Sequence, residues 1–85
     1  MIVRHITIGN VNVWLSIDQL RTYDVNDRNK IIELNQYVCY FKFAEPTPYV
    51  FGELIRKKNN LPVLFNSIDE AIEYAINMIR KRFGI

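Results

Sequence analysis

Apolar and polar side chains alternate on both sides of a Gly-Asn pair near the N-terminus. Residues 2–8 and 11–17 are rich in β-branched side chains and flank Gly9-Asn10, where glycine can supply the positive φ of a two-residue type II′ turn. One face of this register pairs Ile8 with Val11, Ile6 with Val13, Arg4 with Leu15 and Ile2 with Ile17. The other face is largely polar, and a slip of one residue would mix the two faces. The pattern therefore predicts a β-hairpin in this register.

The last fifth of the chain, residues 67–84, has helical spacing. Ser67 is followed three residues later by Glu70, which is a capping box. Apolar side chains then recur every three or four residues, at Ile68, Ala71, Ile72, Ala75, Ile76, Ile79 and Phe83. Gly84 is a natural C-terminal stop. We expect one amphipathic helix that packs across one face of a sheet.

The region between these elements gives mixed signals. Residues 18–30 are mostly polar and predict a long surface loop, with a single helical turn through Leu20 as the alternative. Residues 31–43 hold the densest β signal and predict a strand. From Tyr37 to Phe43 the odd positions are apolar, whereas the apolar Ile32 and Leu34 before them are at even positions. This change of phase near Asn35-Gln36 indicates either a β-bulge or a tight turn.

Two more strands are predicted before the helix. Glu45–Pro48 ends the preceding strand because its two prolines cannot sit in a central ladder. Tyr49–Arg56 reads as a strand with Gly52 as a bulge or a point of close approach, and Asn59-Asn60 turns the chain into a short strand over Leu61–Phe65. The predicted fold class is α+β in a single domain of residues 1–85. It comprises an antiparallel sheet of four to five strands, with the N-terminal hairpin first, and one C-terminal helix on one face.

Composition narrows the class of protein. The chain has 85 residues, of which 49% are hydrophobic and 24% charged, which is too apolar for a disordered tail. No apolar run approaches a membrane span, and the N-terminus lacks the pattern of a signal peptide, so we expect a cytoplasmic protein without membrane contacts. A single cysteine and a single histidine predict neither a disulfide scaffold nor a conventional zinc site. An excess of isoleucine and asparagine suggests an AT-rich coding sequence, as in a phage, a mobile element or a low-GC host.

Catalytic chemistry is not indicated. The only histidine, His5, is expected to stack on Trp14 across the hairpin, and Cys39 shares the apolar face of a strand. The three glycines are isolated, so there is no phosphate-binding loop. The acidic stretch 24–29 lacks the glycine and the spacing of a calcium loop. We therefore expect a protein that is not an enzyme and that uses neither cofactor nor metal.

The net charge of +2 conceals an uneven distribution. Residues 1–55 carry five basic and six acidic side chains, a net of −1, whereas residues 56–85 carry six basic and three acidic ones, a net of +3. The six late cations form two triplets, Arg56, Lys57 and Lys58, and Arg80, Lys81 and Arg82. In one interpretation, the triplet 80–82 complements the dipole at the C-terminus of the helix, and the triplet 56–58 is a solvated strand end that discourages pairing with other sheets. In the other, both triplets contact phosphates of a nucleic acid. Arg82 falls within the apolar arc of the helix, which a frayed last turn or a partner contact would explain.

Two functions follow as expectations. The first is a small protein-binding module, an accessory factor of a phage or mobile element that binds and inhibits or regulates a host protein. One helix can cover only one sheet face, which leaves aromatic and apolar side chains for a partner, namely Trp14, Tyr40, Tyr49 and Leu64. The same surface could close a homodimer. The alternative is a nucleic-acid-binding domain that uses the two basic triplets.

Overall fold

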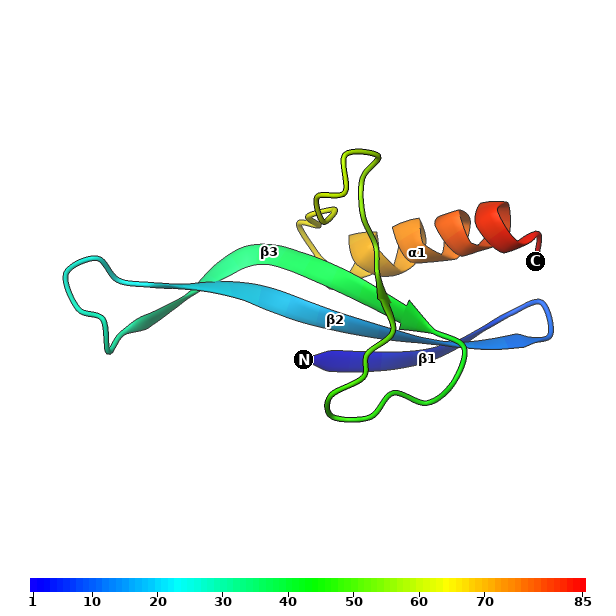
Figure 1. The fold of residues 1–85 in the computed structure, drawn as a ribbon, viewed down its shortest axis with the longest axis horizontal. Helices are drawn as coiled ribbons and strands as arrows, with labels where there is room; N and C mark the ends of the chain where they lie inside the picture. The colour runs from blue at the N-terminus through cyan, green and yellow to red at the C-terminus, as the bar shows by residue number, and fades with distance from the viewer.

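The computed structural model describes residues 1–85 as an antiparallel sheet with one helix across it (Figure 1). The elements are β1 (Ile2–Ile8), β2 (Val11–Tyr23), β3 (Ile31–Lys42), β4 (Glu53–Leu54) and α1 (Ile68–Phe83). The strands lie in the order β1-β2-β3-β4, and each is antiparallel to its neighbour. The predicted α+β fold class is confirmed.

The N-terminal hairpin has the predicted register. Ile8 lies opposite Val11, and the pairing continues without a slip to Ile2 opposite Ile17. Gly9 has a φ of 60°, as a tight turn of this kind requires. Hydrophobic patterning and turn chemistry agree at this hairpin, so its register is strongly specified.

The core lies between α1 and the face of the sheet that α1 covers. β2 contributes the fully buried Val13, Leu15 and Ile17, which alternate with side chains of the other face. The helix faces the core with Ala71, Ala75 and Ile79, all inaccessible to solvent. Two alanines at the contact let the helix backbone approach the sheet closely, while Ile79 fills the space at the far end.

Both ends of α1 are capped as the sequence predicts. The Ser67 hydroxyl accepts a hydrogen bond from the Glu70 backbone N–H at 3.0 Å, and the Glu70 carboxylate accepts one from the Asn66 backbone N–H at 3.0 Å. Gly84 is left-handed with a φ of 69° and donates its N–H to the Arg80 carbonyl. The helix is neither long nor apolar enough to cross a membrane.

The predicted loop over residues 18–30 is wrong for its first part, because β2 continues to Tyr23. Only residues 24–30 connect the strands, and the Asp24 backbone N–H donates to the Lys30 carbonyl at 3.0 Å where the loop closes. The segment pairs with the start of β3, for example Thr22 with Ile32. Neither face of this stretch lies under the helix, so the apolar alternation that marks a half-buried strand is absent.

The change of phase near Asn35-Gln36 is a β-bulge rather than a turn. Between the pairs Gln19↔Tyr37 and Arg21↔Glu33, β2 advances by two residues and β3 by four. The Gln19 side-chain amide donates to the Leu34 carbonyl at 2.9 Å and so satisfies one of the groups that the bulge displaces from the ladder.

The two strands predicted after residue 48 are mostly absent. Of Tyr49–Arg56 only Glu53 and Leu54 form a strand, because Gly52, at a φ of 102°, turns the chain where its backbone meets the Phe41 carbonyl. Leu61–Phe65 is extended but makes only isolated bridges, Pro62 with Arg56 and Phe65 with Tyr37. Proline lacks the N–H that a longer ladder needs. The predicted turn at Asn59-Asn60 is confirmed, with Asn60 at a φ of 69°.

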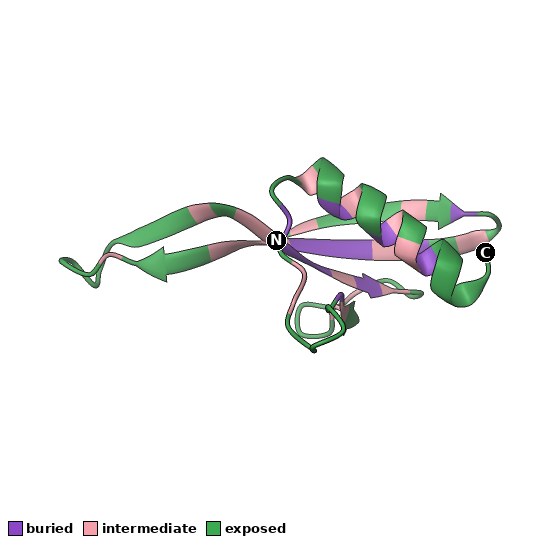
Figure 2. Ribbon diagram, turned by 90° about the horizontal axis from the view of Figure 1, so that it is seen from above, coloured by how far each residue is buried: buried purple, intermediate pink, exposed green.

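The outer halves of β2 and β3 project from the body as a twisted two-stranded ribbon (Figure 1). We call residues 18–36 the β2–β3 arm. The chain measures 49 × 27 × 21 Å, and its radius of gyration is 14.3 Å, against about 12 Å for a compact chain of this length. Figure 2 shows that the buried residues gather beneath α1 while the arm is largely exposed.

Candidate functional site

The arm carries apolar side chains that take no part in the core. The exposed fraction is 66% for Tyr23, 95% for Val25 and 57% for Ile31, and Ile32 is also exposed. The one ion pair in the arm joins the Arg21 Nε to the Glu33 carboxylate at 3.9 Å, and both side chains are exposed. A two-stranded ribbon of this kind gains little stability by itself, and exposed apolar side chains on such an element are typical of an interaction surface.

Both edges of the arm are open. β1 pairs with β2 only as far as Ile17, which lies opposite Ile2, so residues 18–23 of β2 have no paired strand on that side. On the other side β4 pairs only with residues 40 and 41 of β3, and Phe65 bridges to Tyr37, so residues 31–36 are also unpaired. Open edges present backbone N–H and C=O groups that can pair with another chain.

Three cavities lie along the arm, from its base to the loop at its tip. The first, of about 120 Å³, lies at the base of the arm between Ile2, Ile68 and Arg21. The second, of about 250 Å³, lies between Arg21, Tyr23 and Ile31, and the third, of about 390 Å³, lies between Tyr23, Val25 and Arg28. Arg21 separates the first two cavities, and Tyr23 separates the second from the third.

The predicted aromatic patch is assembled only in part. Trp14 and Tyr40 lie on the sheet face opposite α1, in pairs two positions apart on the β2–β3 ladder, and both are half-buried. Trp14 stacks on His5 at 4.4 Å between ring centroids, and Phe51 packs against Tyr40 at 5.7 Å.

The other two residues of that prediction lie elsewhere. Tyr49 is 92% exposed in the connection between β3 and β4, and Leu64 is 42% exposed beside the bridge residue Phe65. Neither belongs to the ladder that holds Trp14 and Tyr40. The face opposite α1 is also more covered than the sequence suggested, since Ser16 and Val38 on it are buried.

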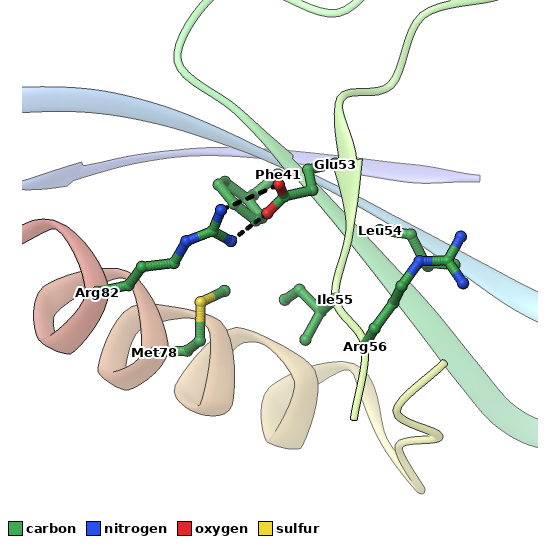
Figure 3. A pocket seen from close by; sticks show the side chains of 7 residues that line it. All are labelled: Phe41, Glu53, Leu54, Ile55, Arg56, Met78 and Arg82. Carbon is green, nitrogen blue, oxygen red and sulfur yellow. Dashed lines mark hydrogen bonds and ion pairs between the residues drawn. The ribbon is translucent and has the colours of Figure 1, made fainter. Parts of the chain in front are cut away.

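Only one residue from each basic triplet lines a common cavity. A cavity of about 390 Å³ between β4 and α1 is lined by Arg56 and Arg82 together with Glu53 and Met78 (Figure 3). The Arg82 guanidinium points at Glu53, while that of Arg56 points away from it and donates to the Asn60 carbonyl at 2.8 Å.

Arg82 forms a two-pronged ion pair with Glu53, so its position within the apolar arc needs no frayed last turn. About half of its side chain remains exposed. The side chains of the other late cations, Lys57, Lys58, Arg80 and Lys81, are exposed.

Cys39 and His5, the side chains whose chemistry could serve a nucleophile or a metal ligand, contact other residues of the fold. Burial raises the pKa of the Cys39 thiol to about 12, so the thiolate that would react is strongly disfavoured. The His5 Nε2 lies 3.0 Å from the Asn12 side-chain oxygen. No three His, Cys, Asp or Glu side chains converge as a metal site would require.

The arm was missed from the sequence although a signal for it exists. Thr22-Tyr23 and Ile31-Ile32 are β-branched or aromatic pairs on either side of a stretch rich in Asp and Asn, which is the pattern of a hairpin. Inside that stretch Asp24 and Asp27 each accept a hydrogen bond from the backbone two residues later, as turn-forming residues do.

Comparison of the chain with protein-family models, curated proteins and solved structures finds no match.

Proposed function

We propose that the protein is a small non-enzymatic module that binds another protein through the β2–β3 arm. The observation that carries this proposal is the exposure of Tyr23, Val25 and Ile31 on an element that projects from the body. Full burial of one such side chain by a partner contributes about 1.5–3 kcal/mol. An arm that does not stabilise its own fold is best explained by contacts outside it.

The half-buried pair Trp14 and Tyr40 supplies a second contact surface on the sheet face opposite α1. Aromatic side chains are enriched where partners bind most tightly. The composition supports an origin in a phage or mobile element, and in that setting the module would inhibit or regulate a host protein.

The test is affinity capture from the native host lysate after nuclease treatment. A double variant, Tyr23→Ser with Ile31→Thr, should reduce capture of the partner at least tenfold. The matched control, Leu61→Ser, changes an apolar side chain of similar exposure (59%) away from the arm and should leave capture unchanged. Capture that is equal for wild type and the arm variant, or that disappears with nuclease alone, would overturn the proposal.

A second candidate is binding to a nucleic-acid backbone, supported by the exposure of Lys57, Lys58, Arg80 and Lys81. Such binding should weaken steeply with salt, with a log–log slope of about −0.9 for each phosphate contacted on duplex DNA. A mobility-shift titration with duplex DNA and with RNA at about 50 mM salt tests it, and the absence of any shift for both would exclude it.

A further inference from the structure

The backbone of β2 in the arm offers its hydrogen-bonding groups to the open edge at every second residue. Tyr37 exchanges both of its backbone hydrogen bonds with Phe65, each at 2.9 Å, so these groups point away from β2. Gln19, directly opposite, is therefore in a non-hydrogen-bonded pair, and its own N–H and C=O point away from β3. Beyond the bulge, the Asp24 N–H donates to the Lys30 carbonyl at 3.0 Å, so Asp24 faces β3. Because the direction alternates along a strand, Tyr23 and Arg21 face the open edge, as Gln19 does.

The residues that face the open edge also border the three cavities. Gln19 and Arg21 line the cavity at the base of the arm, Arg21 and Tyr23 line the next, and Tyr23 lines the last. Arg21 and Tyr23, the two residues that separate the cavities, are two positions apart on β2, or about 6.8 Å along the strand. This is the distance between alternate side chains of any strand that pairs with β2.

We propose that an extended segment of a partner protein adds to the open edge of β2 at residues 18–23 and places alternate side chains in these cavities. This inference rests on the proposed function, and it names the kind of partner that the arm takes. The partner strand would continue the line of β1, which occupies the same edge of β2 up to Ile17. Backbone pairing would provide affinity, and the cavities would select the side chains.

The cavities define the chemistry of the segment. Ile2, Ile17 and Ile68 give the base cavity an apolar lining, so an apolar side chain belongs there. The charged side chains that border the cavities are Arg21, Asp24 and Arg28, a net charge of +1. A carboxylate of the partner opposite Arg21 would compete with Glu33, whose contact to Arg21 is long at 3.9 Å. The expected occupant is an acidic segment with apolar residues at alternate positions.

A helix fits this surface less well than an extended segment. Helical side chains on one face recur every three or four residues, and a helix has no free backbone groups along its length with which to meet the β2 edge. The outward N–H and C=O groups of Gln19, Arg21 and Tyr23 would then remain unpaired under the partner, at a cost.

The experiment is a selection of random twelve-residue peptides, displayed on a carrier, against the purified full chain. The enriched peptides should alternate apolar and polar residues and carry at least one carboxylate. A synthetic enriched peptide is then titrated against wild type, Arg21→Ala and Arg21→Pro. We expect Arg21→Ala to weaken binding by removing the guanidinium, and Arg21→Pro to weaken it at least tenfold further by also removing an outward N–H.

Amide hydrogen exchange on the unmodified chain gives a readout that does not depend on how the variants fold. Saturation with the peptide should slow exchange at the amides of Gln19, Arg21 and Tyr23. The amides of Trp14 and Tyr40, each of which lies between two paired strands, serve as the unchanged reference. Peptides with helical periodicity, or binding that leaves these three amides unprotected, would overturn the strand addition.

Two further outcomes separate this inference from the proposed function. Protection of the three amides in the free chain, together with a dimer in sedimentation, would assign the edge to a second copy and overturn the inference. Partner capture that needs Tyr23 and Ile31 but leaves the edge amides unprotected would overturn strand addition and leave the proposed function intact. Loss of both arm-dependent capture and peptide binding would overturn both.

Discussion

Arg82 and Glu53, 29 residues apart in the sequence, hold the last turn of α1 against β4. The two terminal nitrogens of Arg82 each donate to a different carboxylate oxygen of Glu53, and this contact raises the pKa of the guanidinium. The guanidinium carbon also lies over the rings of Phe41 and Phe83, at 5.8 and 5.1 Å from their centroids. Because β4 has only two residues, this pair is a main side-chain anchor for it.

The first prediction concerns this anchor. Arg82→Ala should lower the melting temperature by a few degrees, because it removes the two-pronged pair and the contacts with both rings. Arg80→Ala is the matched control in the same helical turn. The Arg80 side chain is exposed and makes no hydrogen bond or ion pair in the fold, so this change should have a smaller effect. Thermal unfolding of wild type, Arg82→Ala, Glu53→Ala and the double variant measures the coupling between the two side chains, and Arg80→Ala is unfolded in parallel. Equal melting temperatures for Arg82→Ala and Arg80→Ala would contradict the anchor.

The second prediction concerns Gly52. A Cβ at this position would overlap the Phe41 carbonyl oxygen, and the φ of 102° disfavours any L side chain. Gly52→Ala should therefore cost at least about 2 kcal/mol in unfolding free energy.

Gly9→Ala is the control for this prediction, because its φ is also positive but no atom lies within 4 Å of the added Cβ. It should cost about 1–2 kcal/mol from backbone strain alone. Urea denaturation separates the two variants, and a Gly52→Ala variant that is as stable as Gly9→Ala would show that the close approach is absent.

The hairpin and the helix were predictable because local and long-range signals agree there. Gly9 permits the turn, alternation assigns the faces, and Ser67 with Glu70 marks the start of a helix whose apolar residues have one period. Each of these elements buries one face and exposes the other, which is the condition under which patterning reports structure.

The arm was not predicted because that condition fails. Arg21 and Glu33 face each other across a ribbon that is exposed on both faces. The sequence of such a ribbon is polar on both faces, as the sequence of a surface loop is. The bulge opposite Leu20 makes the pairing harder to predict from the sequence, because β3 has two more residues than β2 between the pairs that flank it. The contact of Arg82 with Glu53 could not be anticipated either, because it joins two elements whose relative position depends on the whole fold.

The third prediction concerns Ser16, which is fully buried on the sheet face opposite α1 and whose hydroxyl has no hydrogen-bonding partner in the protein. Burying an unpaired hydroxyl costs free energy, so Ser16→Ala should leave stability unchanged or raise it by up to about 1 kcal/mol. Ser67→Ala is the same chemical change at the helix N-cap and should lower stability by about 1 kcal/mol. Urea unfolding of the pair tests this contrast, and a larger loss for Ser16→Ala would contradict it.

The fourth prediction concerns Cys39, whose side chain is inaccessible to solvent in the core. Desolvation raises the pKa of its thiol from 9.0 to about 12, a difference that leaves roughly a thousandfold less thiolate at pH 8. Reaction with a chromogenic disulfide reagent at pH 8 should therefore be about that much slower in the native chain than in urea. Rapid labelling of the native chain would contradict the burial.

The same shift sets a pH dependence of stability. Below pH 9 the thiol is protonated in both the folded and the unfolded chain, so Cys39 does not reduce the free energy of unfolding there. As the pH rises from about 9 toward 12, the unfolded chain releases this proton first and the folded state loses stability. Cys39→Val keeps an apolar side chain in the core and removes the titrating group. As the pH rises over this range, the unfolding free energy of wild type should therefore fall relative to that of the variant. Parallel curves for the two proteins from pH 8 to pH 11 would show that Cys39 titrates as it does in the unfolded chain.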